Sequence, residues 1–451
     1  MRAAHSVAVA VLAVFGTTGA LVSSAIAAAD LSSAAKREEQ QYTQLISVSA
    51  GSRPQQGISG LGEGDLPNGA STNPVISNDK RYARLIAFES EASNLVPGDV
   101  NGQKDVFAIQ RAGPVGNNGS AWRPGRTILV SRTWSGQPAD GPSFSAAVDG
   151  AFRHKPSCVA FLSAATNLVP GDTNAKVDAF VSRGPGGPPT RVSLPGGRQS
   201  SADTSQVAVS GDCSRIAFVT GGNLYVRVKA RRPRLLAAGA SDPSFSTGLR
   251  NDLVFGGARG VYLSKGGTAE PRLVGPGGRN PGYNDIDRQV VTYEQNRGGH
   301  VQVVFRDLGG RAQVASSRDG VFGDADSRNP VIGNSGFYIT FESDASNLGV
   351  NALGRASDTN GKPDVYLYTD TRDITLVQSV EEKAVPLPGG GQNPSMSFYG
   401  NYIVFDSPAP VGGALPGDQM PGDQLPFQEV APPEQGVEAP HQIFMRYLGP
   451  A

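Results

Sequence analysis

The stretch from Asn73 to Phe107 reads NPVISNDKRYARLIAFESEASNLVPGDVNGQKDVF, and parts of it return along the rest of the chain. It begins with an Asn-Pro pair, followed by an apolar run that ends at Phe88. A loop rich in Asp, Asn and Gly then leads to a second apolar run. Recurrence of such a unit indicates a repeat architecture, in which each unit buries its apolar faces against its neighbours.

Four short runs, named A to D here, recur in the same order. Run A has seven copies, which start at Asn73, Gly141, Ser205, Asp242, Asn280, Asn329 and Asn393. Run B ends seven times in an aromatic residue, at Phe88, Phe161, Phe218, Phe255, Tyr293, Phe341 and Phe405. Run C also occurs seven times, at Val106, Ala179, Leu224, Val261, Val303, Val365 and Ile443. Run D follows run C only six times, starting at Thr127, Arg191, Arg234, Arg272, Gln313 and Thr375.

The seventh copy of run D lies at the other end of the chain. The sequence TQLIS from Thr43 matches TILVS from Thr127. Four strands in each of seven units, with one strand moved to the N-terminus, predict an all-β fold. This fold is a seven-bladed β-propeller, closed by an N-terminal strand that completes the last blade. Such closure removes exposed sheet edges, and the aromatic residues of runs B and C are expected in the core between blades.

Composition agrees with many short strands and argues against one class of partner. The chain has 451 residues, of which 58 are Gly and 33 are Pro, and these residues favour turns. Lys+Arg and Asp+Glu both number 40, so the net charge gives no sign of a nucleic-acid binder. The basic cluster from Arg227 to Arg234 is interpreted as a solvated turn, with an anionic partner as the alternative.

The N-terminal residues 1–29 are typical of a signal peptide. Arg2 precedes an apolar run from Val7 to Phe15, and a small-x-small cleavage site follows at Ala25 to Ala27. We expect residues 30–41 to form a linker and residues 42–451 to form the propeller. No further hydrophobic span is expected once the signal is removed. The chain is therefore predicted to be secreted or held in the cell envelope.

Cys158 and Cys213 are the two cysteines of the chain. Export would permit a disulfide, whereas two small buried thiols are the alternative. The repeats place Cys158 at the start of run B in the second blade and Cys213 in the A–B turn of the third. Because these blades are adjacent and both positions lie toward the same face, we predict that the two cysteines pair.

Several of these features resemble the propeller repeats of the TolB and WD-repeat-like family. The similarity rests on the Asn-Pro starts, on Ser77-Asn78-Asp79 and Ser210-Gly211-Asp212, and on Ile216-Ala217-Phe218, and it covers residues 42 to 451. It implies the fold but little about activity, since the family includes binding modules, transport accessories and lyases. Neither the α/β domain that precedes the propeller in TolB nor the hydrolase domain of related peptidases is expected here.

Three of the loops between runs B and C share an Asp-x-Asn-x-x-x-Asp pattern. Their residues are Asp99, Asn101 and Asp105; Asp172, Asn174 and Asp178; and Asp358, Asn360 and Asp364. Oxygen ligands around a tight turn suit a hard cation, and the pattern is similar to the latter part of the calcium loops of integrin-type propellers. The preceding ligand is replaced by Pro97, Pro170 or Ala356, and Ala175 replaces a turn glycine. Two hypotheses stay open: a weak calcium site, or an Asx-turn without metal.

Signals for catalysis are sparse, and no catalytic residue is predicted. Of the three histidines after the predicted signal, His154 lies between runs A and B, whereas His300 and His441 lie near the start of run C. These positions are on opposite faces of a blade, so the three side chains cannot share one metal. A nucleophile elbow and a phosphate loop are also missing from the sequence.

The lengths of the B–C connections indicate where function lies. They are long in blades one, two, six and seven, which are consecutive in a closed ring, and minimal in blades three and four. Long loops gathered on one arc of a rigid scaffold are typical of a binding surface. We therefore predict a non-enzymatic binding or scaffold protein for a cell-envelope or extracellular protein or glycan. The alternatives are a propeller enzyme, such as a carbohydrate lyase or glycosidase, and a structural envelope protein.

Overall fold

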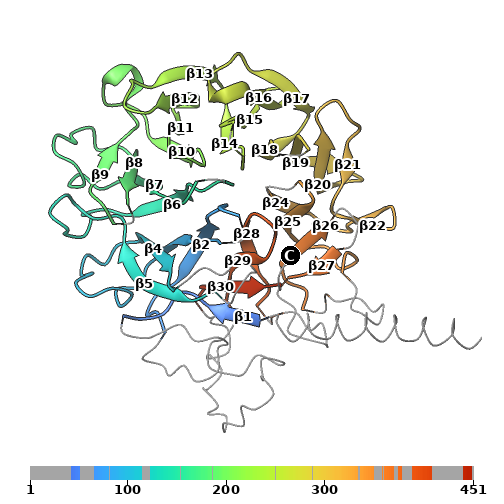
Figure 1. Cartoon of the computed structure of the whole chain (residues 1–451), viewed down its shortest axis with the longest axis horizontal. Coiled ribbons are helices and arrows are strands. Elements are labelled where there is room, and N and C mark those ends of the chain that lie inside the picture. Colours follow the sequence, from blue (N-terminus) through green and yellow to red (C-terminus); the bar gives the residue numbers. More distant parts are fainter. Residues whose placement is uncertain are drawn as a thin grey trace, which may run out of the picture.

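Seven four-stranded antiparallel sheets stand in a ring around a central axis in the computed structural model (Figure 1). This arrangement confirms the predicted all-β, seven-bladed propeller. The structure describes residues 42–50, 66–80, 82–113, 122–152, 154–184, 186–248, 250–286, 288–333, 336–349, 358, 360–369, 374–377, 387, 389–408 and 440–448. The predicted signal peptide and linker lie outside these residues. Within them, no helix is long and apolar enough to span a membrane.

The strands of the first six blades follow chain order across each sheet. Blade 1 contains β2 (Ser71–Ile76), β3 (Leu85–Ser90), β4 (Asp105–Arg111) and β5 (Pro124–Leu129). Blade 2 contains β6 (Ser143–Val148), β7 (Cys158–Ser163), β8 (Asp178–Arg183) and β9 (Pro189–Arg191). Blade 3 contains β10 (Thr204–Val209), β11 (Arg215–Thr220), β12 (Asn223–Val228) and β13 (Arg234–Ala238). Blade 4 contains β14 (Ser241–Phe245), β15 (Leu253–Gly257), β16 (Gly260–Ser264) and β17 (Arg272–Pro276).

Blade 5 contains β18 (Arg279–Asn284), β19 (Val290–Arg297), β20 (His300–Asp307) and β21 (Gln313–Val314). Blade 6 contains β24 (Ser327–Ile332), β25 (Tyr338–Ser343), β26 (Asp364–Thr369) and β27 (Ile374–Leu376). Blade 7 contains β28 (Gln392–Met396), β29 (Tyr402–Ser407), β30 (Gln442–Tyr447) and β1 (Tyr42–Leu45). Between blades 5 and 6 lies the small hairpin of β22 (Ser317–Arg318) and β23 (Val321–Phe322). Two short 3₁₀ turns span Pro195–Gly197 and Lys265–Gly267.

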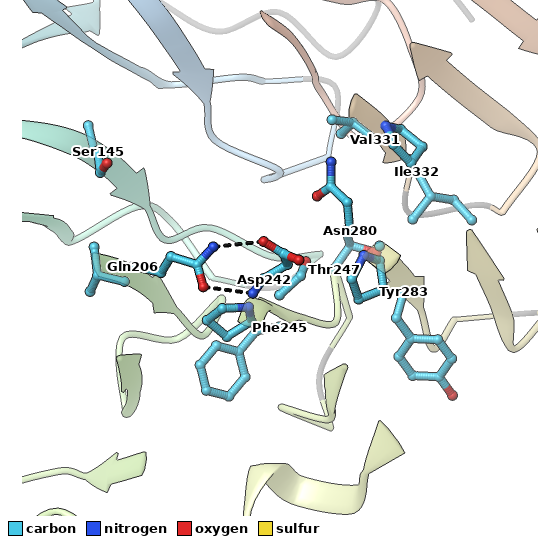
Figure 2. Close-up of a pocket in the computed structure, with 16 residues that line it drawn as sticks. Ser145, Gln206, Asp242, Phe245, Thr247, Asn280, Tyr283, Val331 and Ile332 are labelled. Atoms are coloured by element: carbon cyan, nitrogen blue, oxygen red, sulfur yellow. Dashed lines mark hydrogen bonds between the residues drawn. The ribbon is translucent and has the colours of Figure 1, made fainter. Parts of the chain in front are cut away.

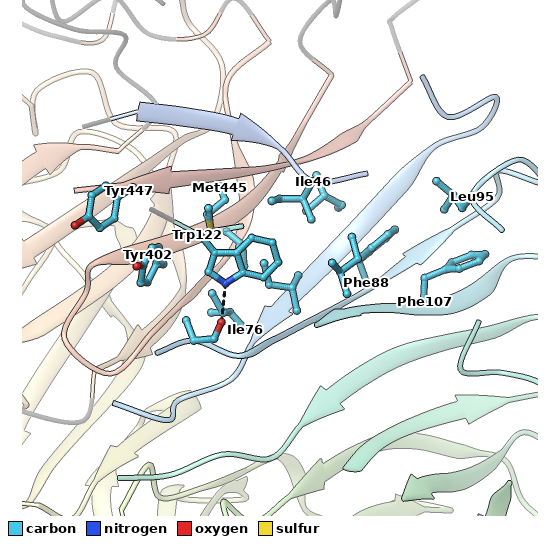
Figure 3. Packing of buried hydrophobic residues seen from close by; sticks show 14 of the residues in the cluster. Ile46, Ile76, Phe88, Leu95, Phe107, Trp122, Tyr402, Met445 and Tyr447 are labelled. Carbon is cyan, nitrogen blue, oxygen red and sulfur yellow. Dashed lines mark hydrogen bonds between the residues drawn. The ribbon is translucent and has the colours of Figure 1, made fainter. Parts of the chain in front are cut away.

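The N-terminal strand closes the ring as predicted. β1 pairs antiparallel with β30, with Leu45 opposite Phe444. The residues that follow β1 continue this edge, because the Ser47 hydroxyl donates to Gln442 Oε1 at 2.8 Å. Leu45, Ile46 and Val48 are buried, and Ile46 lies in the core shared by blades 7 and 1 (Figure 3).

The second strand of each blade is mostly apolar up to the aromatic residue of run B because neighbouring blades cover both of its sides. Every residue of β3, β7 and β29 is buried. The aromatic residue of run B stacks on an aromatic residue of run C in six blades. Their ring centroids lie 5.5–5.9 Å apart in the pairs Phe88–Phe107, Phe161–Phe180, Phe218–Tyr225, Phe255–Tyr262, Phe341–Tyr366 and Phe405–Phe444. These contacts confirm the predicted core role.

Each innermost strand contains a bulge, which explains the recurring Asn-Pro pair. Asn73 has a φ of 50°, and the same left-handed conformation occurs at Asp242 and Asn280. Asn and Asp tolerate this region better than most residues. In blade 2 the predicted register of run A is wrong, because Ser145 has φ 52° at the bulge and the Gly-Pro pair from Gly141 precedes β6.

The predicted disulfide is confirmed. Cys158 at the start of β7 and Cys213 in the turn before β11 form a bond with Cα atoms 6.3 Å apart. Both cysteines are buried. The bond therefore ties blade 2 to blade 3 near the face that carries the A–B turns.

Candidate binding face

One face of the ring carries the B–C connections together with the connections from each strand D to the next strand A. We name it the B–C face. Its connections run over residues 91–104 in blade 1 and 164–177 in blade 2. In blades 3, 4 and 5 they shrink to residues 221–222, 258–259 and 298–299. The described residues thus agree with the predicted arc in blades 1 to 5, while the B–C connection of blade 6 is described in part and that of blade 7 lies largely outside them.

The long loops are fastened to the core. Leu95, Leu168 and Leu348 occupy equivalent loop positions and are buried. Leu95 packs in the cluster that contains Phe88 and Phe107. These three loops are therefore each anchored in the core close to their start, and the residues beyond the anchor remain for contact with a partner.

A polar clamp joins each of these loops to the preceding D–A connection. In blade 1 the side chain of Asn94 accepts from Asn68 N–H at 3.0 Å and donates to Leu66 O at 2.8 Å. The side chain of Asn68 in turn accepts from Ser93 N–H at 2.9 Å. The same clamp is formed in blades 2 and 6 by the pairs Asn167–Asp140 and Asn347–Asp324. The repeated sequences ASNL, ATNL and ASNL were the signal for it.

The Asn and the second Asp of each predicted metal loop hold the outer strand of the blade. In blade 1 the Ser131 hydroxyl donates to Asp105 Oδ1 at 2.5 Å, and Asn101 Nδ2 donates to Asp105 Oδ2 at 2.6 Å. Asn101 Nδ2 also donates to Ala139 O at 3.1 Å. The corresponding bonds in blade 2 link Asn174, Asp178, Ser193 and Ser200, and in blade 6 they link Asn360, Asp364 and Leu387.

Blades 5 and 7 make the same connection with a single glutamine. Gln302 accepts from the Ser316 hydroxyl at 2.6 Å and donates to Gly323 O at 2.9 Å. Gln442 bonds in the same way to Ser47 and Gly69. Because an uncharged side chain performs this task in two blades, the Asn and second Asp of the other loops have a structural role that requires no ion.

The Asn oxygen is also engaged in each of the three loops. Asn101 Oδ1 accepts from Gln103 N–H at 2.9 Å, and Asn360 Oδ1 accepts from Lys362 N–H at 2.8 Å. The bond in blade 2, from Lys176 N–H to Asn174 Oδ1, is longer at 3.4 Å. These are the contacts of an Asx-turn. In blade 1, Asp99 Oδ1 is the loop carboxylate oxygen without a hydrogen-bond partner, and metal binding stays a prediction.

The carboxylates of the blade 1 loop lie in an unfavourable setting for charge. Asp99 is 5% exposed, and burial raises its pKa. Burial also raises the pKa of Asp105 to about 6, and the neighbouring charge of Asp99 adds to this rise. A positive charge placed between the Asp99 and Asp105 carboxylates would lower the cost of burying both negative charges.

Four acidic side chains join consecutive blades near the inner strands, directly after the aromatic residue of run B. We name Glu89, Glu294, Glu342 and Asp406 the acidic belt; they belong to blades 1, 5, 6 and 7. Each carboxylate accepts from the backbone N–H at the bulge of the next blade. The bonds are Ser145 N to Glu89 (2.6 Å), Asn329 N to Glu294 (3.0 Å), Asn393 N to Glu342 (2.9 Å) and Asn73 N to Asp406 (3.2 Å).

Most of the belt has a basic partner at its side. Lys104 Nζ lies 3.9 Å from Glu89, and Arg279 Nε lies 3.0 Å from Glu294. His441 Nδ1 lies 2.7 Å from Asp406 Oδ2. Burial raises the pKa of Glu89 and of Glu342, and the charge of Asp406 raises both further. In the sequence, the belt is visible as an acidic residue directly after the aromatic residue of run B. The four copies read FES, YEQ, FES and FDS.

The raised pKa of Glu342 predicts a stability change with pH. A carboxyl whose folded pKa exceeds its unfolded value stabilises the fold at low pH, and this contribution is lost as pH rises through the folded pKa. Each unit of such a shift corresponds to about 1.4 kcal/mol. Glu342→Gln should therefore gain stability relative to the wild type between pH 4 and pH 7. Chemical denaturation at several pH values measures this difference.

Glutamine is a suitable replacement because Gln206 Oε1 already accepts the bulge N–H of Asp242 at 2.7 Å. The control is Glu91→Gln, since the Glu91 side chain is 58% exposed on the same face. Its stability difference from the wild type should not change with pH. If the stability difference between Glu342→Gln and the wild type also stays constant with pH, burial does not disfavour the charged form of the Glu342 carboxyl.

A cavity of about 370 Å³ lies along the inner strands, lined by the bulge residues of blades 2 to 5 and by Pro330 to Ile332 (Figure 2). Gln206 donates to Asp242 Oδ1 at 2.7 Å across its wall. Phe245 and Tyr283 add apolar surface. Asp242 is the one acid among the lining residues, and the belt position after the aromatic residue of run B is occupied in blades 2 to 4 by Leu162, Val219 and Gly256.

The three histidines do not converge. His154 lies in the A–B connection of blade 2, whereas His300 and His441 lie on the B–C side of blades 5 and 7. His300 Nδ1 is 3.7 Å from Asp326, and His441 contacts Asp406. The predicted separation of the histidines is confirmed.

Exposed apolar side chains gather on the B–C face. Val100, at the tip of the blade 1 loop, is 85% exposed, and Trp134, in the connection to blade 2, is 78% exposed. Val321 and Phe322 form the second strand, β23, of the hairpin between blades 5 and 6, and both are exposed. Among the described residues, Leu235 on the outer strand of blade 3 is the one strongly exposed large apolar side chain elsewhere.

Trp134 is presented by a fixed turn. Thr133 N–H donates to Gln137 O at 2.7 Å, and Gln137 N–H donates to Thr133 Oγ1 at 3.0 Å. Asn101 of the blade 1 loop bonds to Ala139 in the same connection. The turn that carries Trp134 and the loop that carries Val100 are therefore tied to one another.

Comparison with known proteins supports the propeller fold but identifies no function. No family model matches the chain, and no curated protein matches it. Solved structures similar to it include TolB from Acinetobacter baumannii, with a TM-score of 0.36 and 16% identity over 56% of this chain and 58% of TolB. Oligogalacturonate lyase from Vibrio parahaemolyticus gives a TM-score of 0.48 and 7% identity over 90% of this chain and 96% of that one.

The β-propeller domain of the Trilobed protease from Pyrococcus furiosus gives a TM-score of 0.45 and 9% identity, covering 76% of this chain and 90% of that domain. TolB and other propellers are thus among the similar structures, as the sequence resemblance predicted. The chain spans less than two thirds of the TolB structure, and the similarity concerns the fold alone.

Proposed function

We propose that this protein is a non-enzymatic binding propeller, exported to the cell surface or beyond, which holds an extracytoplasmic protein or glycan on its B–C face. The observation that carries the proposal is the strong exposure of Trp134 and Val100 on two connections that the Asn101–Ala139 bond joins. The turn that carries Trp134 is held by its own hydrogen bonds, and tryptophan is enriched among the residues that dominate binding energy. Large exposed apolar side chains in a group mark interaction sites more often than single ones do.

The anchoring of the loops supports the same proposal. The clamp of Asn94 and the buried Leu95 hold the blade 1 loop in place before a partner arrives. A preformed surface avoids the cost of ordering loops on binding. A neutral net charge gives no general attraction to anionic polymers, which leaves shape and the exposed apolar groups as the basis of recognition.

The alternative of a propeller enzyme would draw on the acidic belt, where Asp406 contacts His441 at 2.7 Å. The belt carboxylates, however, accept the bulge N–H groups of neighbouring blades. Such bonds assign them to holding the ring together. An activity lost in Asp406→Asn with unchanged melting temperature would favour the enzyme instead.

The test of binding uses point substitutions, since removal of a whole loop would also remove the buried Leu95 or Leu168. Trp134→Ala should weaken binding of the immobilised protein to fragments of its own cell envelope at least tenfold, on the order of the 2 kcal/mol typical of a dominant interface residue. Biolayer interferometry with a dilution series of the fragments measures this. Treating the fragments with protease or with periodate separates a protein partner from a glycan.

Leu235→Ala is the matched control, because Leu235 is 57% exposed but lies on the outer strand of blade 3. It should bind as the wild type does. Equal binding by Trp134→Ala and the wild type would show that the B–C face is not the binding surface. Both variants should melt at the wild-type temperature.

A further inference from the structure

In blade 2 a positively charged side chain, that of Arg191, lies at the loop with the Asp-x-Asn pattern. Arg191 on β9 places Nη1 2.8 Å from Asp172 Oδ1 and 3.1 Å from Asp178 Oδ2. Its Nη2 lies 3.3 Å from Gly171 O. The arginine side chain is 9% exposed. Three oxygens of this loop therefore surround one largely buried positive charge.

Blade 1 repeats the three oxygens without the arginine. Gly98, Asp99 and Asp105 correspond to Gly171, Asp172 and Asp178 in the two loop sequences. β5 places Leu129 opposite Phe107, where β9 places Arg191 opposite Phe180. Within the described part of the chain, no ion pair reaches Asp99 or Asp105, and Asp99 Oδ1 is buried without a hydrogen-bond partner.

The site has space beside it. A cavity of about 530 Å³ is lined by Gly98 and Leu129. Arg111, Arg126 and Arg132 also line this cavity. The guanidinium groups of Arg111 and Arg132 donate to the carbonyl oxygens of Tyr82 and Gly186, and Arg126 is exposed to solvent. A small hydrated cation could thus approach the loop from solvent.

We propose that blade 1 binds a calcium-type divalent cation through the Asp99 and Asp105 carboxylates and the Gly98 carbonyl, at the position that the Arg191 guanidinium takes in blade 2. Carboxylate and carbonyl oxygens are the ligands that hard cations prefer. The loop of blade 2 binds no ion, because the Arg191 guanidinium already lies between its two carboxylates. Blade 6 has Leu376 opposite Tyr366, so its Asp358 loop is grouped with blade 1 rather than with blade 2.

Calcium chloride added to the chelator-treated full chain is the probe. All proteins carry Asp358→Asn, so that the loop of blade 1 is tested without that of blade 6. Calcium at 10 mM should raise the melting temperature by about 1–3 °C, as expected for a dissociation constant of ~0.1–1 mM. Adding Asp99→Asn should weaken calcium binding at least tenfold, and Leu129→Arg should abolish the shift by supplying the missing cation.

Asp172→Asn is the control and should leave the calcium response unchanged. The proposal is wrong if calcium produces no shift in the Asp358→Asn protein, or if Asp99→Asn keeps the full response. A response lost in Asp172→Asn but kept in Asp99→Asn would place the ion in blade 2 and would also overturn it. Because Asp99→Asn changes no atom count in the side chain, it decides the question even if Leu129→Arg fails to fold.

Discussion

Removal of residues 30–50 should abolish cooperative unfolding or lower the melting temperature by more than 15 °C. The deletion takes away β1 and with it the buried side chains of Leu45, Ile46 and Val48. Burial of each such side chain contributes about 1.5–3 kcal/mol, so their sum, roughly 5–9 kcal/mol, is comparable to the whole stability of a typical domain. The exposed edge of β30 should also promote association. Differential scanning calorimetry measures the transition.

The matched control removes residues 30–41 alone and keeps β1. Its melting temperature should equal that of the chain starting at residue 30. A single change, Ile46→Ala, should cost about 2–5 kcal/mol, since Ile46 is fully buried between blades. Identical melting of the 30–50 deletion and the control would contradict the closure of the ring by β1.

Replacement of both cysteines by alanine should lower the free energy of unfolding by about 4 kcal/mol. The bond between Cys158 and Cys213 closes a loop with a sequence separation of 55. The chain-entropy estimate for a loop of this length gives the stated value. Urea denaturation of the two proteins measures the difference, and alanine avoids placing unsatisfied hydroxyl groups in a buried position.

Each single variant should be as unstable as the double variant, because either change removes the bond. When the wild type is unfolded and refolded in the presence of dithiothreitol, its free energy of unfolding should fall. The same treatment should leave the free energy of unfolding of the double variant unchanged. Two free thiols in the mass spectrum of the protein purified from its own cells would show that the bond does not form in its own environment.

The fold could be predicted because its local signals agree with one another. The count of run D copies and the match of TQLIS to TILVS predicted the closing strand, and the aromatic ends of run B predicted the core. The one error in register, at Gly141, arose because a Gly-Pro pair is also common before a strand. Only the backbone at Ser145 shows which residue occupies the bulge.

The candidate site was less predictable because its parts are joined across the chain. The pattern of Asp99, Asn101 and Asp105 was visible, but the role of Arg191 depends on the pairing of β9 with β8. To predict the acidic belt, one must know where each acid lies relative to the next blade. The phasing of the repeats along the sequence does not give that position. The exposure of Trp134 follows from a turn whose bonds are set by neighbouring residues.

The pairing of β1 with β30 also determines the order in which the molecule can form. Ser47 and Gln442, which are hydrogen-bonded, are 395 residues apart in sequence. Contacts of such long range close late, because the chain between them must be ordered first. β1, the first strand of the propeller to be synthesised, can therefore pair only after β30, the last strand, has been made. Until residues 442–447 emerge, blade 7 lacks its third strand, and the growing chain exposes a sheet edge that is open to chaperones and to other chains.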